Sequence, residues 1–187
     1  SGLFEFVEPD YIFRTAAEPR DVSYQDGTLW GLRNRGDGTG VIGADIDARK
    51  AWDITTGSTE VVVGVIDSGI WYTHNDLKSQ MWTNPGEIAD NGKDDDENGW
   101  IDDVHGINAV VGSGDPLDDN GHGTHVSGVM GASANDSGEV VGVAWNVRLM
   151  ALKASDSFGI FMASDIVQAI QYGVANGCHI LNASLSG

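Results

Sequence analysis

The sequence predicts an α/β fold, with a parallel sheet flanked by helices in three layers. Three mainly aliphatic runs, at residues 60–66, 147–152 and 179–182, have the pattern of strands buried on both faces of a parallel sheet. Between the last two runs, residues 164–174 place apolar side chains at helical spacing. Strand, helix and strand in this order are typical of the βαβ unit from which α/β domains are built.

Shorter elements are predicted around these runs. Residues 3–13 are apolar, aromatic and β-branched, which predicts a strand followed by an extended piece. Residues 14–43 contain six glycines and predict a surface arm. Residues 48–52 predict a short helix, and residues 122–132 predict another whose small side chains allow close packing.

The charge of the chain restricts its partners. There are 28 acidic and 10 basic side chains, and the net charge is −18. Such a surface repels nucleic acid and anionic lipid, and it suits cation binding or solubility outside the cell. No apolar run approaches the roughly 18 residues that would cross a bilayer. The single cysteine, Cys178, forbids an internal disulfide. We therefore expect no nucleic-acid partner and no membrane partner.

A carboxylate and two histidines are the first candidates for chemistry. Asp67 ends a predicted buried strand, where open α/β sheets place their active sites, although phospho-acceptor and nucleotide-binding domains also carry an Asp there. The dinucleotide alternative lacks its Gly-x-Gly-x-x-Gly motif. His122 and His125 begin a predicted helix, and a third ligand at zinc-like spacing is missing. A general base needs one His oriented by a carboxylate, and Asp67 is the candidate for that carboxylate.

Two motifs carry a family resemblance. Val-Ile-Asp-Ser-Gly-Ile at residues 65–70 and Asn-Gly-His-Gly-Thr-His-Val-Ser-Gly at residues 120–128 resemble the Asp and His signatures of the subtilisin-like serine peptidases, the subtilase family. They also occur in the Asp-then-His order of that family. The resemblance covers residues 21–187. It continues in three further segments: 141–144, 149–153 and 180–187.

This resemblance implies an endopeptidase that acts on protein or peptide substrates. Asp67 then orients His122, and His122 is the general base and acid toward a serine hydroxyl, while Ser68 and His125 are structural. The resemblance also implies two substrate-binding strands. They are Ser184, Leu185 and Ser186 on one side, and Gly159, Ile160 and Phe161 on the other.

The third motif of the family, a Gly-Thr-Ser-Met-like turn, does not occur in these residues. We therefore expect the N-terminal part of a catalytic domain, an incomplete fold that is inactive alone and whose partner is the C-terminal half of that domain. The alternative is a non-catalytic calcium-binding fragment or module. The discriminating feature is a Gly-Thr-Ser sequence downstream in the same protein.

An acidic insertion at about residues 84–105 predicts a calcium site. Its oxygen-bearing residues alternate and a glycine follows them, a pattern that suits a hard cation with six to eight oxygen ligands. The pattern matches an EF-hand only through Gly99, because position twelve is His105, and a solvated acidic loop is the alternative. The predicted ligands are Asp94, Asp96, Asn98, Trp100, Asp102 and Asp103.

The resemblance alone implies three further features. Asp21, Asp76 and Asn135 match a second calcium site. Residues 1–14 resemble the tail of the family's own inhibitory propeptide, followed by the catalytic part at 15–187; the alternative is an arm that packs on the surface. Secretion is inferred from the family and from the calcium requirement.

Overall fold

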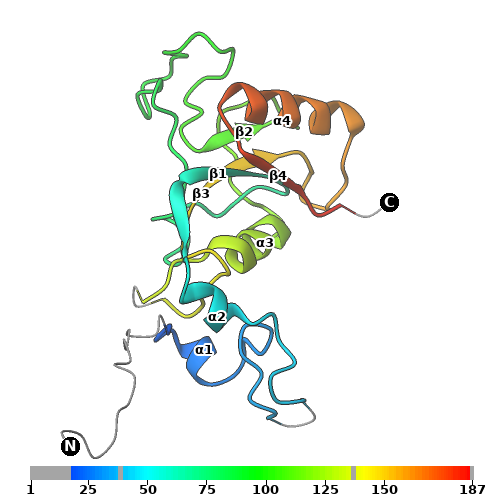
Figure 1. Cartoon of the computed structure of the whole chain (residues 1–187). Coiled ribbons are helices and arrows are strands. Elements are labelled where there is room, and N and C mark those ends of the chain that lie inside the picture. The colour runs from blue at the N-terminus through cyan, green and yellow to red at the C-terminus, as the bar shows by residue number, and fades with distance from the viewer. Residues whose placement is uncertain (1–17, 38–39, 136–137, 186–187) are drawn as a thin grey trace, which may run out of the picture.

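The computed structural model describes residues 18–37, 40–135 and 138–185. In these residues, four parallel strands form one sheet in the order β2-β3-β1-β4. The strands are β1 (Gly57–Asp67), β2 (Gly106–Asn108), β3 (Asn146–Lys153) and β4 (Ile180–Ala183) (Figure 1). The predicted α/β fold with a parallel sheet is therefore confirmed.

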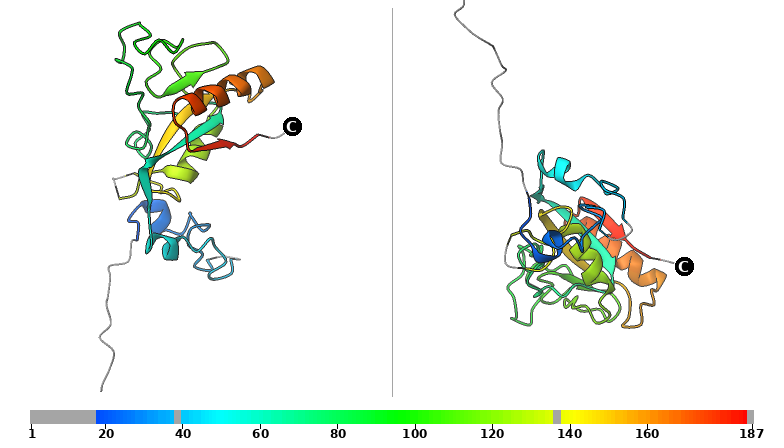
Figure 2. Two further views of the ribbon diagram at one scale, coloured as in Figure 1. Left: turned by 45° about the horizontal axis from the view of Figure 1, so that its top comes forward. Right: turned by 90° about the horizontal axis from the view of Figure 1, so that it is seen from below.

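Helices cover both faces of the sheet. α3 (His122–Gly131) lies on one face and α4 (Ala163–Ala175) on the other, which gives three layers (Figure 1). The short helices α1 (Val22–Gln25) and α2 (Ala48–Trp52) lie together beyond one end of the sheet, as the left view of Figure 2 also shows.

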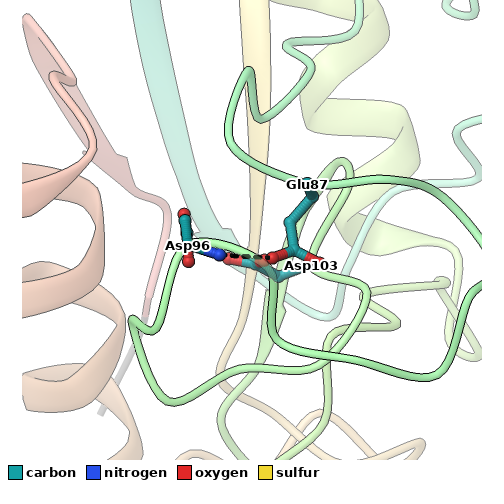
Figure 3. Close-up of side chains that lie close together, drawn as sticks. All are labelled: Glu87, Asp96 and Asp103. Atoms are coloured by element: carbon teal, nitrogen blue, oxygen red, sulfur yellow. Dashed lines mark hydrogen bonds between the residues drawn. The ribbon is translucent and has the colours of Figure 1, made fainter.

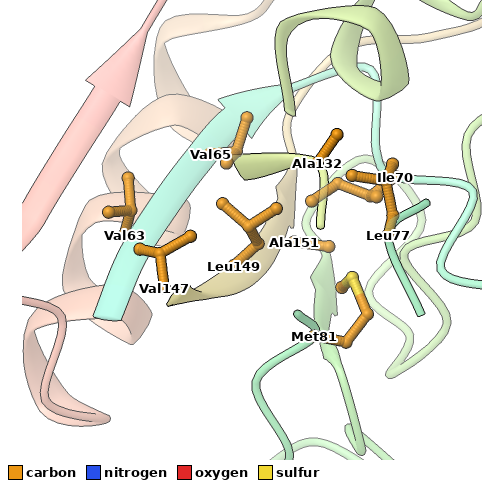
Figure 4. Packing of buried hydrophobic residues seen from close by; sticks show 9 residues of the cluster. All are labelled: Val63, Val65, Ile70, Leu77, Met81, Ala132, Val147, Leu149 and Ala151. Atoms are coloured by element: carbon orange, nitrogen blue, oxygen red, sulfur yellow. The ribbon is translucent and has the colours of Figure 1, made fainter. Parts of the chain in front are cut away.

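The alternation of side chains along the strands builds two cores. Val63, Val65 and Leu149 lie in the cluster that packs beside α3 (Figure 4). Their neighbours Ile66 and Leu152 point to the other face, where the cluster includes residues of α4. The side-chain period of two along a strand thus makes the sheet the shared wall of both cores.

Two parts of the fold differ from the sequence predictions. β2 was not predicted, because three residues are too few to show a period. The segment predicted as a surface arm contains α1 and buries Tyr24, whose ring lies 5.8 Å from that of Trp52. The strand predicted at residues 3–13 lies outside the described residues.

The carboxyl ends of the central strands meet at one edge of the sheet. Asp67, the last residue of β1, is in register with Lys153, the last residue of β3. On the other side of β1, Ile66 is in register with Ala183 of β4. The sheet therefore brings the ends of β1, β3 and β4 together, which is the place that the sequence predicted for a site.

Candidate active site

Asp67 and His122 form a close pair at this edge. Asp67 is buried at the end of β1, and its oxygens Oδ1 and Oδ2 lie 2.7 and 2.9 Å from Nδ1 of His122, the first residue of α3. The His122 side chain keeps 51% of its surface exposed. A carboxylate accepts hydrogen bonds, so the neutral imidazole tautomer that fits this geometry is the one with its hydrogen on Nδ1 and with Nε2 as the acceptor. The structure thus brings together the two residues that the sequence predicted as partners.

The turn after β1 is joined to the start of α3. The Ser68 N–H donates to Asp67 Oδ1 at 2.7 Å, and the Gly123 N–H donates to the Ser68 hydroxyl oxygen at 2.9 Å. Gly69 has a φ of 104°, and a Cβ there would lie 2.4 Å from the Pro116 carbonyl oxygen. Ser68 therefore connects the Asp67 segment to the His122 segment by hydrogen bonds, which agrees with the structural role that the resemblance implies for it.

Asp118 accepts hydrogen bonds from the same two segments. Its carboxylate accepts hydrogen bonds from the Ser68 hydroxyl at 2.8 Å, from the Gly121 N–H at 2.9 Å and from the Thr124 N–H at 3.0 Å. Burial alone would raise the pKa of the Asp118 carboxyl, but the hydrogen bonds from Gly121, Thr124 and Asn120 outweigh burial and lower it. Sequence reasoning missed this residue, although it lies only four positions before His122.

His125 does not join His122 in a metal site. Among the described residues, the only group of three or more His, Cys, Asp or Glu side chains close enough to hold a metal is entirely acidic. The His125 N–H donates to the Gly121 carbonyl as part of the first turn of α3. The structure therefore favours the general-base interpretation of His122 over the metal interpretation.

The described substrate-binding candidates follow strands that end at the same edge of the sheet as Asp67. Ser184 and Leu185 directly follow β4, one residue beyond the pairing of β4 with β1. On the other side, a tight turn contains Gly159, Ile160 and Phe161, and it is closed by a bridge between Ser155 and Phe161. Ser186 lies outside the described residues.

Asn120 ties that turn to the His122 segment. Its side-chain Nδ2 donates to the Ser157 carbonyl oxygen at 3.0 Å. The side chains of Phe158, Ile160 and Met162 are 86%, 60% and 60% exposed, so the turn presents an apolar surface near His122. The two predicted substrate strands therefore emerge at the same edge as the Asp67–His122 pair.

Three carboxylates come together in the acidic loop. Oxygens of Glu87, Asp96 and Asp103 lie within 4.8 Å of one another (Figure 3). Asp103 is fully buried, and the Asn84 amide Nδ2 donates to both Asp96 and Asp103 at 3.1 Å. Like charges this close repel one another, so this oxygen-only group fits a hard cation such as calcium. Sequence reasoning missed Glu87, which precedes the alternating pattern by seven residues.

Tyr172 of α4 donates a hydrogen bond to the buried Asp103. Its hydroxyl donates to Asp103 Oδ2, and its ring packs edge-on against Trp82 and Trp100. Burial, followed by the hydrogen bond to Asp103 and the charge of Asp103, raises the pKa of Tyr172. The hydroxyl therefore stays protonated and serves as a donor to the carboxylate.

Two other predicted loop ligands, Asp94 and Asp102, are not part of the three-carboxylate group. Asp94 accepts hydrogen bonds from the Asn98 and Gly99 N–H groups, and Asp102 accepts from those of Asn91 and Gly92. Asn98 does contact the group, because its amide donates to Asp96 and Asp103. The Trp100 side chain has no acceptor, so only its backbone carbonyl could serve as a ligand.

Asp21, Asp76 and Asn135 also lie in one region. The Asn135 N–H donates to both oxygens of Asp21, at 3.2 and 3.1 Å. Asp76 is 2% exposed; its Oδ2 accepts from the Glu139 and Val140 N–H groups at 3.3 Å. Its Oδ1 is buried and has no hydrogen-bond partner among the residues that the structure describes. A buried carboxylate oxygen left without a donor fits a metal ligand, so these residues fit the calcium site that the resemblance implies.

Comparisons with known proteins identify the class of the chain. Residues 58–187 match the model of the subtilase family, Peptidase S8. The chain therefore belongs to the subtilase family. Within the described residues, no helix is both long enough and apolar enough to span a bilayer.

Several named relatives are similar to this chain. Subtilisin-like protease 1 of Plasmodium berghei (strain Anka) is 44% identical over 137 residues, which are 71% of this chain and 22% of the relative. Thermophilic serine proteinase of Bacillus sp. (strain AK1) is 33% identical over 183 residues, 98% of this chain and 37% of the relative. Cell wall-associated protease of Bacillus subtilis (strain 168) is 27% identical over 185 residues, 98% of this chain and 18% of the relative. The chain thus spans less than two fifths of the length of each of these relatives.

Proposed function

We propose that the protein to which this chain belongs is a secreted, calcium-dependent serine endopeptidase that cleaves protein or peptide substrates. The single observation that carries the proposal is the hydrogen-bonded pair of Asp67 and His122 at the carboxyl edge of the sheet. Membership of the subtilase family and the protease names of the relatives support the reaction class. The name of the cell wall-associated relative supports a location of the protein outside the cell membrane.

The pair would act as general base and acid. Asp67 holds His122 with its hydrogen on Nδ1, so that Nε2 can take the proton of a serine hydroxyl as that oxygen attacks the substrate carbonyl. His122 then returns the proton to the leaving amine, and the Asp67 carboxylate stabilises the imidazolium between these two steps. The serine and the oxyanion donor are expected from the C-terminal half of the same catalytic domain.

Extended peptides are the proposed substrates. A peptide lying between the segment after β4 and the turn at residues 155–161 would pass beside His122, with backbone hydrogen bonds holding it to Ser184–Ser186 and to residues 159–161. The exposed Phe158, Ile160 and Met162 side chains favour apolar residues in the substrate. The protein's own propeptide, expected in residues 1–14, would be the first such occupant.

Calcium is the proposed structural cofactor. The acidic loop would hold one ion through Asp103, Asp96 and Glu87, and a second ion would be held by Asp76, Asp21 and Asn135. Bound calcium would supply positive charge that links loops otherwise repelled by their carboxylates, and it would take no part in proton transfer.

A serine-directed probe tests the catalytic proposal. The full-length protein is treated with a fluorophosphonate in the presence of calcium, and the labelled peptide is identified by mass spectrometry. We expect labelling of one serine outside this chain, and we expect Asp67→Asn and His122→Ala to lower peptide hydrolysis by about 10⁴-fold. His179→Asn, which changes another exposed histidine, is the matched control and keeps activity.

The alternative is a non-catalytic calcium-binding module. It is favoured by the density of carboxylates, with eight acids between Glu87 and Asp103. A full-length protein that is stabilised by calcium but shows neither labelling nor hydrolysis would establish this alternative and end the peptidase proposal.

A further inference from the structure

Lys153 carries a buried charge that the proposed reaction does not use. It is the last residue of β3, and its side chain is only 4% exposed. A lysine ammonium is rarely buried unless it is paired, because leaving water costs free energy. The contacts of this ammonium therefore indicate what it does.

The ammonium donates to groups in two different segments. Nζ donates to the Ser68 carbonyl oxygen at 2.7 Å and to Asp119 Oδ1 at 2.5 Å. Ser68 directly follows Asp67, and Asp119 lies three residues before His122. One side chain thus connects the turn that carries Asp67 to the loop that leads into α3.

The strands do not need this contact in order to pair. β1 and β3 are already held in register up to Asp67 and Lys153, and the Ala154 N–H donates to the Asp67 carbonyl oxygen at 2.8 Å. A methionine would fill much the same space without the desolvation of a charge. The two segments also meet through the Ser68 hydroxyl and Asp118, through the Asp67–His122 pair, and through the hydrogen bond from the Trp71 N–H to the Thr124 hydroxyl. What the ammonium adds is a charged bridge between a backbone carbonyl of one segment and a carboxylate of the other.

We infer that Lys153 is a positioning residue that fixes the relative placement of Asp67 and His122 by clamping the Ser68 carbonyl to Asp119. The inference rests on the proposed peptidase function. Lys153 acts through Asp67 and His122 and touches neither the substrate nor the reacting atoms. The clamp should affect the chemical step more than substrate binding, because small displacements of catalytic groups lower the rate steeply.

The test compares Lys153→Met and Asp119→Ala in the full-length protein with calcium present. We expect Lys153→Met to lower kcat by about 10- to 100-fold with KM within about twofold of the wild-type value. Asp119→Ala removes the carboxylate but leaves the contact of Lys153 with the Ser68 carbonyl, so it should lower kcat by only about 3- to 10-fold. The double variant should lower kcat by less than the product of the two single effects. Lys50→Met, which removes an exposed lysine on α2 paired with Asp47, is the control and should leave kcat unchanged.

A second readout does not require activity. Nitrogen-15 spectra of labelled histidine report the tautomer of His122, and we expect Lys153→Met to reduce the population with hydrogen on Nδ1. Unchanged kcat and unchanged His122 signals in Lys153→Met would overturn the inference. If that variant does not fold, an unchanged kcat in Asp119→Ala would overturn it. A wild-type protein without hydrolysis would instead reject the peptidase function, and the His122 spectra would still decide whether the clamp exists.

Discussion

Asp118 is a single residue whose carboxylate accepts hydrogen bonds from both signature segments. Its donors come from the turn after β1 and from the first turn of α3. Hydrogen bonds to the charged form lower its pKa in spite of burial. A carboxyl whose pKa is lower in the folded state than in the unfolded state, where it is about 3.9, stabilises the fold above that pH. This stabilisation is lost as the pH falls through the lower, folded value.

We expect Asp118→Asn to destabilise the protein at pH 7 and to matter less in acid. An amide loses the charge-assisted hydrogen bonds, so the free energy of unfolding should fall by about 1–3 kcal/mol at pH 7. The difference between variant and wild type should shrink as the pH falls below about 4 and then through the lower, folded pKa, because the carboxyl takes up its proton first in the unfolded state and then in the folded state. Denaturant unfolding at pH 7 and at acid pH measures both values. The exposed Glu60→Gln is the control, and a difference that grows in acid would contradict the assignment.

At the level of elements, the site depends on how closely α3 approaches the end of β1. Gly123, in the first turn of α3, is buried, and a Cβ there would lie 2.1 Å from the Gly69 carbonyl oxygen and 3.1 Å from Asp67 Cβ. The absence of a side chain at this position is what lets the helix start beside the Asp67 turn. His122 reaches Asp67 because its neighbour occupies almost no space.

We expect Gly123→Ala to separate the Asp67–His122 pair. The added methyl group meets backbone, which cannot move aside as a flexible side chain can, so the variant should lose about 1–3 kcal/mol of stability. Hydrolysis by the full-length protein should fall by at least tenfold, since the two groups proposed to transfer the proton move apart. Gly128→Ala on the same helix has open space around its Cβ and should raise helix stability by up to about 1 kcal/mol with activity retained. Equal behaviour of the two variants in melting and kinetic assays would contradict this account.

The elements that could be predicted from the sequence include all the longer ones. β1, β3, α3 and α4 each extend over eight or more residues and were predicted within a few residues of their bounds. The shorter α2 and β4 were also predicted, but β4 is exposed or half-buried and not, as predicted, a strand buried on both faces. β2 could not be predicted, because its three residues are placed by pairing with β3 and not by their own pattern. The packing of Tyr24 against Trp52 was missed because a glycine-rich composition says nothing about a distant aromatic partner.

The residues of the candidate site also divide into those that a sequence motif predicts and those that only the folded structure brings together. Asp67 and His122 could be proposed as partners because each lies in a recognisable motif at the end of a predicted element. The contacts of Lys153 with Asp119 and of Tyr172 with Asp103 span 34 and 69 residues of the chain. Neither pair has a local pattern, so only the folded arrangement of strands and loops brings the members together. Whether each predicted residue acts as assigned stays a prediction that the variants above test.

For the whole molecule, the clustering of negative charge opposes folding. The net charge is −18, and eight acids against one lysine between residues 87 and 103 contribute −7 of it. The acidic loop at residues 84–105, which contains the Glu87, Asp96 and Asp103 group, lies at one end of the molecule (Figure 1). The second group, Asp76, Asp21 and Asn135, joins the segment before α1 to the loop after α3. Self-repulsion of this kind destabilises a folded chain unless cations offset it.

Removal of calcium should therefore lower the melting temperature of the full-length protein. A ligand at about a hundred times its Kd adds about 2.7 kcal/mol to the free energy of unfolding, so chelation should lower the melting temperature by about 5–10 °C for each strong site. Asp103→Asn and Asp76→Asn should each remove part of the calcium-dependent shift, because each variant disables a different site. Sodium chloride separates the two possible causes, since screening weakens repulsion without filling a site. If salt alone restores the melting temperature of the chelated protein, repulsion and not binding explains the effect; if only calcium restores it, the carboxylates form specific sites.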